Sequence, residues 1–411
     1  MTAPSLGLRN DCVMLRVAMK SGAILVLNSG SSSLKFAVIE PDSGNVVAHG
    51  IAQRLGTGEP TFQFGSQPER ALGQGAAHAE ALQALLAELK DVAIAAVGHR
   101  VVHGGEAFSD SVLLDDAVLN EIRACSELAP LHNPANVLGI EAARSAFPEL
   151  PQVAVFDTAF HQTLPRAAYL YAIPYEYYER HRVRRYGFHG TSHSYVAGVA
   201  ARIIGRPLAS LELITAHLGN GASVSAVSGG RSVDTSMGFT PLEGVVMGTR
   251  SGDVDPNLHE FLAKHAQLDL HQITDMLNKK SGLLGLSGVS NDMRTLLALR
   301  AEGNDRAGLA IEVFCYRLAK SILALCAGLP RVDALVFTGG IGEHAAEVRA
   351  QTLGHLRVLG ILLDEQLNRV HGAEQHGRIT TEASKLLSLV IPTNEELVIA
   401  RETARLTLQA G

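Results

Sequence analysis

One short pattern occurs twice in this chain, at residues 24–38 and 213–227, and it constrains the fold more than any other feature. The copies, ILVLNSGSSSLKFAV and LITAHLGNGASVSAV, each join an apolar run, a small polar loop with glycine and a second apolar run. Apolar runs of this length are typical of buried strands, so each copy predicts a β-hairpin. Such a hairpin, repeated about half the chain apart, predicts a duplicated domain with a nucleotide in the cleft between the copies. Chance similarity of two glycine-containing hairpins is the alternative.

The loop of the first hairpin is suited to holding an anion such as phosphate. Gly30 permits unusual backbone angles, and the serines from Ser29 to Ser33 offer hydroxyls beside free backbone N–H groups. Lys35 adds a positive charge just after the loop. A serine-rich turn with a surface lysine is the alternative interpretation.

Length and charge narrow the class of protein. With 411 residues, 46% of them hydrophobic, the chain has enough apolar material for two domains of ordinary size. The formal charge of −6 comes without a long run of one sign. Neither nucleic acid nor a membrane surface is therefore an expected partner, and a small molecule is. The four cysteines contain no CxxC pair, which argues against a zinc site or a disulfide framework and favours a reducing cytoplasm.

Two stretches indicate how the chain is divided. Residues 1–20 are predicted to be a loose extension, because charged side chains interrupt any apolar run that could form a signal peptide or a membrane helix. Residues 171–189 are rich in tyrosine and arginine and are interpreted as the region between the domains. A basic aromatic patch that covers an interface is the alternative for this second stretch.

Two charged residues lie at the ends of predicted strands. Arg100, within HRVVHGGE, follows a strand predicted over residues 92–97, and Asp157 follows one over residues 153–156. Ligands of α/β sheets gather at strand ends, so both side chains are candidates for a functional site. The alternatives are a salt bridge for Arg100 and a turn cap for Asp157.

Glycine accompanies polar residues in two later segments. Residues 231–256 lack the apolar periodicity of a helix, and long irregular segments of this kind are often functional. Within them, Arg250 has glycines nearby and a guanidinium that can grip a phosphoryl or carboxylate group with two hydrogen bonds. A strand predicted over residues 334–337 opens into TGGIGEHAAEVR, and a strand, a glycine turn and a helix in this order are typical of nucleotide binding.

The last predicted helix begins near TNEEL. Thr393 and Glu396 have the spacing of a capping box, which gives Glu396 a structural role. Glu395 in the first turn is left to bind a metal or to favour the helix dipole.

Together these segments resemble the acetate kinase family from about residue 24 to residue 408. The matching segments are LVLNSGSSSLK, HRVVHGGE, PLHNP, FDTAFH, YGFHGTSHSYV, HLGNGAS, DTSMGFTPLEG, GTRSGD, GLLGLSGVSNDMR, TGGIGE and TNEEL. This family belongs to the superfamily of sugar kinases, Hsp70 chaperones and actin. The resemblance implies an α/β fold with two RNase-H-like βββαβαβα domains flanking a nucleotide cleft. Residues 21–170 would form the N-terminal domain, with a C-terminal helix at 394–411 packing back onto it, and residues 171–393 the C-terminal domain.

The resemblance also implies roles for individual residues. The catalytic group would be Arg100, Asp157, His189 and Arg250. Asp157 would be the catalytic carboxylate, His189 would stabilise the transition state, and the two arginines would grip the acetate carboxylate and the phosphoryl group. The substrate would be bound by Arg100 and His132 and by a small apolar pocket for its methyl group, formed by Val102, Leu131, Phe188 and Pro241. ATP would be bound by Lys35, His217, Leu218, Gly219, Asn220, Gly221, Asp292, Met293, Arg294, Gly340, Ile341, Gly342, Glu343 and His344. Asn28 and Glu395 would hold Mg²⁺, with Mn²⁺ as a possible substitute. The family usually has Asn where this chain has His344, which affects the expected nucleotide contacts.

The activity implied is reversible, Mg²⁺-dependent transfer of the γ-phosphate of ATP to acetate, giving acetyl phosphate and ADP by direct in-line transfer. Acetate, with a pKa near that of Glu at ~4.3, is already an anion at neutral pH, so it needs no general base. What it needs is cancellation of charge as it approaches a polyanionic phosphate. The family further implies a homodimer. A propionate or butyrate kinase is one alternative, and an ATP-switched binding protein of the Hsp70 or actin kind is another.

Overall fold

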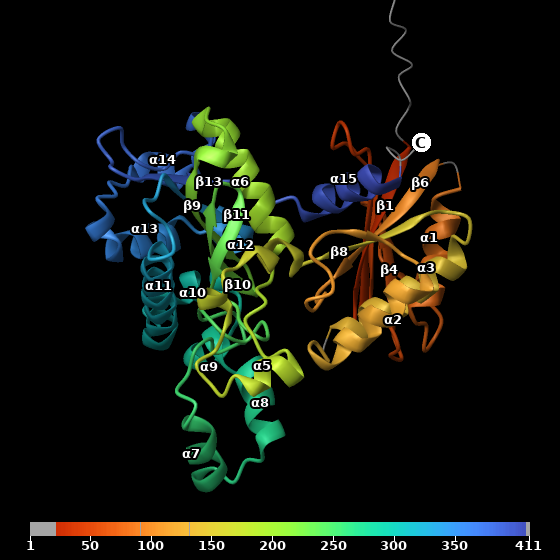
Figure 1. The fold of residues 1–411 in the computed structure, drawn as a ribbon, viewed down its shortest axis with the longest axis horizontal. Coiled ribbons are helices and arrows are strands. Elements are labelled where there is room, and N and C mark those ends of the chain that lie inside the picture. The colour runs from red at the N-terminus through yellow and green to blue at the C-terminus, as the bar shows by residue number, and fades with distance from the viewer. Residues whose placement is uncertain (1–21, 91, 131, 408–411) are drawn as a thin grey trace, which may run out of the picture.

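The computed structural model describes residues 22–407 except 91 and 131, and its chain forms two lobes, each built around one β-sheet (Figure 1). The predicted extension at residues 1–20, the predicted pocket residue Leu131 and the end of the predicted C-terminal helix therefore lie outside the described residues. Within the described part of the chain, no helix has the length and apolar character needed to cross a membrane.

The first lobe contains an eight-stranded sheet in the order β5-β4-β3-β2-β1-β6-β8-β7. Its strands are β1 (Ala23–Gly30), β2 (Ser33–Ile39), β3 (Val46–Gln53), β4 (Thr61–Phe64), β5 (Arg70–Ala71), β6 (Ile94–Val101), β7 (Val112–Leu113) and β8 (Gln152–Phe156). Helices α1 (His78–Glu88), α2 (Asp116–Ala124) and α3 (Asn133–Ala146) cover this sheet. The second sheet has five strands in the order β11-β10-β9-β12-β13. These are β9 (Glu212–Leu218), β10 (Ala222–Ser228), β11 (Arg231–Thr235), β12 (Ala334–Thr338) and β13 (Leu387–Val390).

The two sheets repeat one topology. In the first, β1, β2 and β3 form an antiparallel meander, and β6 and β8 add in parallel on the other side of β1. In the second, β9, β10 and β11 form the same meander, and β12 and β13 add in parallel beside β9. The predicted hairpins are the β1–β2 and β9–β10 pairs, which occupy equivalent places. The predicted α/β fold with a duplicated RNase-H-like unit is confirmed.

The remaining helices belong mainly to the second lobe. They are α4 (Arg166–Tyr169), α5 (Glu176–His181), α6 (Gly190–Ile204), α7 (Leu258–His265), α8 (Leu270–Lys279), α9 (Gly282–Ser287), α10 (Met293–Ala301), α11 (Asp305–Cys326), α12 (Gly339–His344), α13 (Ala346–His355) and α14 (Glu365–Arg369). The long helix α11 buries its apolar stripe, including Ile311, Phe314 and Leu318, in the core against the β9–β10 side of the sheet. The glycine turn after β12 leads directly into α12, as the sequence predicts.

The last helix, α15 (Glu395–Thr407), returns to the first lobe and lies against β1, β6 and β8 (Figure 1). Leu397, Ile399 and Ala400 on this helix share a core with residues of that sheet. The approach requires Gly98 in β6, because a Cβ atom there would lie 2.3 Å from the hydroxyl oxygen of Thr403. The boundaries of the two domains stay a prediction.

The predicted capping box of this helix is wrong. The side chain of Asn394 caps α15 by accepting a hydrogen bond from the N–H of Leu397 at 2.9 Å. The hydroxyl of Thr393 instead lies 2.8 Å from that of Ser192 in α6. Thr393 therefore links the start of α15 to the second lobe, because the helix begins too late for Thr393 to reach its first free N–H groups.

Candidate active site

Strand pairing brings the predicted catalytic residues of the first lobe together. Leu27 in β1 pairs with His99 in β6, and Arg100 in β6 pairs with Val155 in β8. These strands are parallel, so their carboxyl ends lie at one edge of the sheet, where β1 presents Asn28, β6 presents Arg100 and the turn after β8 presents Asp157. This edge faces the second lobe, as strand-end residues of α/β sheets commonly face a ligand.

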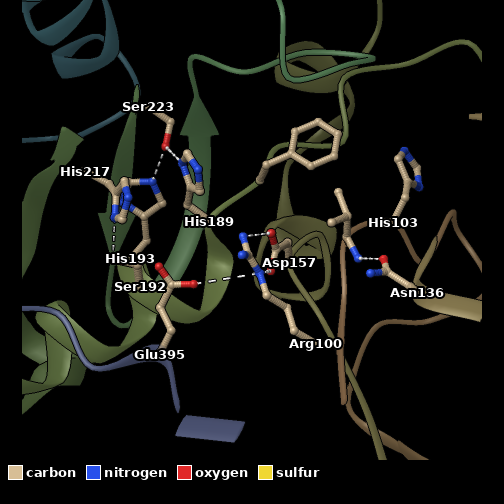
Figure 2. Close-up of polar contacts among 12 residues, drawn as sticks. Arg100, His103, Asn136, Asp157, His189, Ser192, His193, His217, Ser223 and Glu395 are labelled. Atoms are coloured by element: carbon tan, nitrogen blue, oxygen red, sulfur yellow. Dashed lines mark hydrogen bonds and ion pairs between the residues drawn. The ribbon is translucent and has the colours of Figure 1, made fainter. Parts of the chain in front are cut away.

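Arg100 is held between two carboxylates (Figure 2). Its Nε and Nη2 donate to the two oxygens of Asp157 at 2.9 and 2.7 Å, and its Nε lies 3.9 Å from Glu395 on α15. Burial alone would lower the pKa of Arg100, but the negative charges of Asp157 and Glu395 outweigh it and raise that pKa above its ordinary value. The guanidinium is therefore permanently charged, and Asp157 fixes its orientation.

His189 lies at the start of α6 in the left-handed region, at φ 56°. Its ring stacks on that of His217 with the centroids 4.3 Å apart, and its Nδ1 lies 2.9 Å from the hydroxyl oxygen of Ser223. Burial is the main reason that the pKa of His189 is held well below its ordinary value, and the neighbouring His217 and Arg100 add to the effect. The ring is neutral at pH 7, and its Nε2 has no hydrogen-bond partner among the residues that the structure describes.

Arg250 supplies a second cation with no carboxylate partner in the described part of the chain. Its Nη1 donates only to the carbonyl of Pro241, at 3.3 Å, and makes a long contact with the sulfur of Met247. Burial lowers the pKa of Arg250, yet the guanidinium remains protonated because that pKa starts so high. A half-buried arginine without a carboxylate partner is suited to an anionic ligand.

Gly221 keeps open the space between Arg250 and His189. A Cβ atom at this position would lie 3.5 Å from His189 Nε2 and 3.6 Å from Arg250 Nη1. Both nitrogens therefore border one small volume at the beginning of β10. A tetrahedral oxyanion placed there would meet both side chains at once.

A cavity of about 270 Å³ opens beside Arg250. Its lining includes the predicted residues His132 and Pro241, together with Leu128, Ala129, Pro130, Thr240, Leu242, Arg250, His271, Thr274, Asp275, Asn278 and Lys279. Burial, and after it the positive charge of Arg250, lower the pKa of His132. The predicted pocket residues Val102 and Phe188 are not among these lining residues. Val102 packs at the edge of the second lobe's core and Phe188 is buried in that core. The roles of Val102 and Phe188 stay predictions.

A second cavity, of about 420 Å³, joins three predicted nucleotide-binding segments. Its lining residues are Gly219, Asn220, Asn291, Asp292, Met293, Arg294, Leu297, Gly340, Ile341, His344 and Ala345. They come from the β9–β10 loop, the start of α10 and the turn into α12. The cavity is thus formed by the glycine-rich segments that the sequence indicated.

Several predicted nucleotide residues do not line this cavity. Leu218 is fully buried, and Glu343 accepts hydrogen bonds from the N–H groups of Gly339 and Thr393. Lys35 lies on the first lobe, where it pairs across the hairpin with Asn28. His217, Gly221 and Gly342 also lie outside the lining residues. Their predicted contacts with ATP stay predictions.

Asn291, Leu297 and Ala345 line the same cavity and were not predicted individually. Asn291 donates a hydrogen bond from its side chain to that of Asn220, at 2.8 Å. Its place in SGVSNDMR, directly before Asp292, is a sequence signal that could have identified it. For Leu297 and Ala345, the sequence signal that could have identified them is their helical spacing from predicted residues.

Comparison of the sequence with known protein families identifies the family of this chain. Residues 23–401 match the model of the acetokinase family. The chain belongs to the acetokinase family.

Individual relatives match nearly the whole length of this chain. The acetate kinase of Deinococcus radiodurans is 58% identical over 387 residues, which are 92% of this chain and 97% of that protein. The acetate kinase of Thermoanaerobacter pseudethanolicus is 52% identical, over 93% of this chain and 98% of that protein. Among solved structures, a propionate kinase from Francisella tularensis has a TM-score of 0.89 and 46% identity, covering 94% of this chain and 100% of that one. The acetate kinase of Porphyromonas gingivalis has a TM-score of 0.87 and 42% identity, covering 93% and 99%.

The oxygen donors of the candidate site fit a magnesium ion bound together with a nucleotide. No group of three His, Cys, Asp or Glu residues in the described part of the chain could hold a metal ion by itself. Mg²⁺ usually takes only one or two carboxylates, several waters and the substrate phosphates. The carboxylate of Glu395 and the side-chain amide oxygen of Asn28 supply donors of this kind. The side chain of Asn28 makes no hydrogen bond among the described residues. Burial raises the pKa of Glu395, as expected of a carboxylate that lacks a full counter-charge.

Proposed function

We propose that this protein is an acetate kinase, which transfers the γ-phosphoryl group of ATP to acetate and catalyses the reverse reaction. The observation that carries the proposal is the position of Arg250, a half-buried cation with no carboxylate partner among the described residues. It lines the 270 Å³ cavity and, with His189, borders the space at Gly221. We place the γ-phosphoryl group in the space at Gly221. An acetate carboxylate beside Arg250 would then lie next to it. Membership of the acetokinase family supports this assignment.

The nucleotide is proposed to lie in the 420 Å³ cavity with its phosphates directed toward Gly221. Asn220 lines that cavity and is the residue before Gly221, so the β9–β10 loop connects the two places. The glycines of this loop let phosphate oxygens approach the backbone. Bound Mg²⁺, held by Asn28 and Glu395, would supply charge neutralisation on the phosphates.

Charge cancellation is the main task of the protein's own residues. Two anions must meet, and Arg250, Arg100 and the Nε2 group of His189 would oppose their repulsion around the transferring group. Arginines aimed in this way contribute on the order of 10³ in rate. The site therefore needs no proton acceptor for its nucleophile.

Asp157 is proposed to position Arg100 and not to act as a general base or as a phosphate acceptor. Both of its carboxylate oxygens already accept hydrogen bonds from Arg100. A carboxylate in a buried bidentate pair is a poor nucleophile, because attack would leave Arg100 uncompensated. This supports direct in-line transfer from ATP to acetate.

Propionate is the second candidate substrate, because the Francisella tularensis structure is that of a propionate kinase. One methylene changes binding by only about 1 to 3 kcal/mol in an apolar pocket, so family membership alone does not separate the two acids. The decisive experiment is phosphoryl transfer from Mg-ATP to acetate, propionate and butyrate side by side, with the acyl phosphate trapped by hydroxylamine. We expect the highest kcat/KM with acetate. A higher value with propionate would reassign the substrate, and ATP hydrolysis without trapped product would refute the proposal.

Arg250→Lys is the matched variant for that assay. Lysine keeps the charge but loses the planar fork that can hold a carboxylate and a phosphoryl oxygen together. We expect kcat to fall by about 10² or more, while ATP affinity changes little because Arg250 is not among the residues that line the nucleotide cavity. Wild-type turnover in this variant would contradict the role of Arg250.

A cytoplasmic homodimer is proposed as the state of the protein in the cell. ATP as co-substrate and the free thiols of Cys125, Cys315 and Cys326 support the location. Mass measurement by light scattering tests the dimer, and a mass of about 44 kDa, that of one chain, would contradict it.

A further inference from the structure

A chain of hydrogen bonds runs from His189 into the second lobe (Figure 2). His189 Nδ1 lies 2.9 Å from the hydroxyl oxygen of Ser223, and the same oxygen lies 2.8 Å from His193 Nε2. His193 Nδ1 in turn lies 2.7 Å from the hydroxyl oxygen of Thr215. Ser223, His193 and Thr215 are fully buried, so water does not offer them other partners.

The choice of donor and acceptor at each step of this hydrogen-bond chain depends on the choice at the neighbouring steps. Burial holds the pKa of both His189 and His193 well below the ordinary value, so both rings are neutral at pH 7. A neutral imidazole has one donor nitrogen and one acceptor nitrogen, and a hydroxyl has one proton to donate. If one member of this hydrogen-bond chain reverses its role alone, a hydroxyl proton is left without an acceptor or two acceptors face each other, and one hydrogen bond is lost.

Thr215, at the inner end, decides the direction. Its hydroxyl has two possible acceptors, His193 Nδ1 at 2.7 Å and the carbonyl oxygen of Ser225 at 3.4 Å. In the reverse direction His193 would donate to Thr215, and Thr215 would have to donate across the 3.4 Å to Ser225, which is too long for a good O–H···O hydrogen bond. With Thr215 donating to His193, His193 donates from Nε2 to Ser223, and Ser223 donates to His189 Nδ1. The proton of His189 is then on Nε2.

We propose that Thr215, His193 and Ser223 are positioning residues that fix His189 as the Nε2–H tautomer, so that a neutral ring donates a hydrogen bond to the transferring phosphoryl group. This inference rests on the proposed function. Nε2 borders the open space at Gly221 that Arg250 Nη1 also borders, so donor and cation face one place. The other tautomer would direct a nitrogen lone pair at phosphate oxygens and repel them.

The ring of His189 is also held in its plane. His217 stacks on it at 4.3 Å with an angle of 25° between the rings, and His217 Nδ1 is bound by the hydroxyl of Ser192 at 2.8 Å. A 180° flip of the His189 ring would keep this stacking, but it would replace Nδ1 with a carbon and so lose the contact with Ser223. The tautomer can therefore be set by hydrogen bonding without a competing ring orientation.

The tautomer can be read directly by ¹⁵N NMR of protein labelled at histidine. The chain has 17 histidines, and the signals of His189 are identified by their absence from a His189→Asn variant. We expect a pyrrole-type shift for Nε2 and a pyridine-type shift for Nδ1 at pH 7, without substrates. The reverse pattern, or an imidazolium pattern, overturns the proposal. Because no turnover is needed, this result stays decisive even if the protein does not phosphorylate acetate.

Kinetics of Ser223→Ala then tests whether the chain matters for catalysis. We expect kcat to fall by about tenfold or more, less than the ~10²–10³ for loss of a whole donor, because His189 remains but its tautomer is no longer fixed. The KM values for ATP and acetate should stay within about twofold, and the ¹⁵N signals of His189 should become a mixture of tautomers. Unchanged kcat and unchanged signals would overturn the proposal.

Ser225→Ala is the matched control. Ser225 pairs with Thr215 across β9 and β10 and is equally buried, but its hydroxyl contacts Ser232 and the carbonyl of Asp234 and is not part of the chain. Its alanine variant should keep the wild-type kcat and tautomer. An equal fall of kcat in both variants would show that removal of a buried hydroxyl disturbs this sheet generally, and would also overturn the proposal.

Discussion

Replacing Asp157 with Asn tests the central geometry of the candidate site. Asp157 is 1% exposed, and both of its oxygens accept hydrogen bonds from Arg100, at 2.9 and 2.7 Å. Asn has nearly the same shape, but it removes the negative charge and replaces one acceptor with an NH₂ group that would face the guanidinium. Arg100 would then have Glu395, 3.9 Å away, as its remaining negative neighbour.

Two magnitudes follow from this pairing. Removal of one partner from a buried ion pair destabilises a protein by about 3–5 kcal/mol, and the lower end applies here because Asn keeps one acceptor. The shift of Arg100 toward Glu395 would take a cation away from the transferring group. Loss of this cation should lower kcat by ~10³, which corresponds to about 4 kcal/mol of activation free energy. ATP affinity should stay within about twofold, because Asp157 does not line the nucleotide cavity.

The assay measures kcat by hydroxylamine trapping, ATP binding by calorimetry and stability by urea denaturation. Glu106→Gln is the matched control, because Glu106 accepts a hydrogen bond at 2.9 Å from Arg184, a buried arginine outside the candidate site. This control should lose stability and keep its kcat. If Asp157→Asn retained more than about a tenth of the wild-type kcat, the proposed role of Asp157 would be refuted.

Three further perturbations have defined outcomes. Val102→Ala should enlarge the predicted methyl pocket and raise the kcat/KM ratio of propionate to acetate by about tenfold, and an unchanged ratio would remove Val102 from the pocket. His344→Asn should change the KM for ATP by less than about threefold, because the His344 side chain is 74% exposed and its charged neighbour Glu343 is 3.9 Å away. A tenfold change in this KM would contradict the minor role expected of His344. His99 is buried against Gln152, and burial lowers its pKa to about 4 from an unfolded value of ~6.5. Between those two pH values the unfolded chain binds a proton that the folded chain does not, so stability falls as pH falls. His99→Gln should therefore flatten the decline in unfolding free energy between pH 7 and pH 5, measured by urea denaturation, and an unchanged slope would show that His99 does not contribute.

The sequence by itself determined the repeated fold and the chemical character of the site. Both hairpins, β1–β2 and β9–β10, were predictable because an apolar run, a glycine loop and a second apolar run are local patterns. The segments around Asn220, Asp292 and Gly340 were also recognisable as nucleotide-binding, and the structure places them around one cavity. Such patterns lie within short segments, so they can be recognised without knowing which distant segments pack against them.

Only the tertiary structure decided which side chains pair. Arg100 had a salt bridge and a ligand contact as open alternatives, and parallel pairing of β6 with β8 gives it both carboxylate oxygens of Asp157. The cap of α15 shifted from Thr393 to Asn394, because the contact of Thr393 with Ser192 comes from the other lobe. The hydrogen-bond chain behind His189 likewise joins a helix to two strands that are distant in sequence. Such pairings depend on the register of strands and the docking of helices, which are set by the packing of the whole core and leave no mark in any one segment.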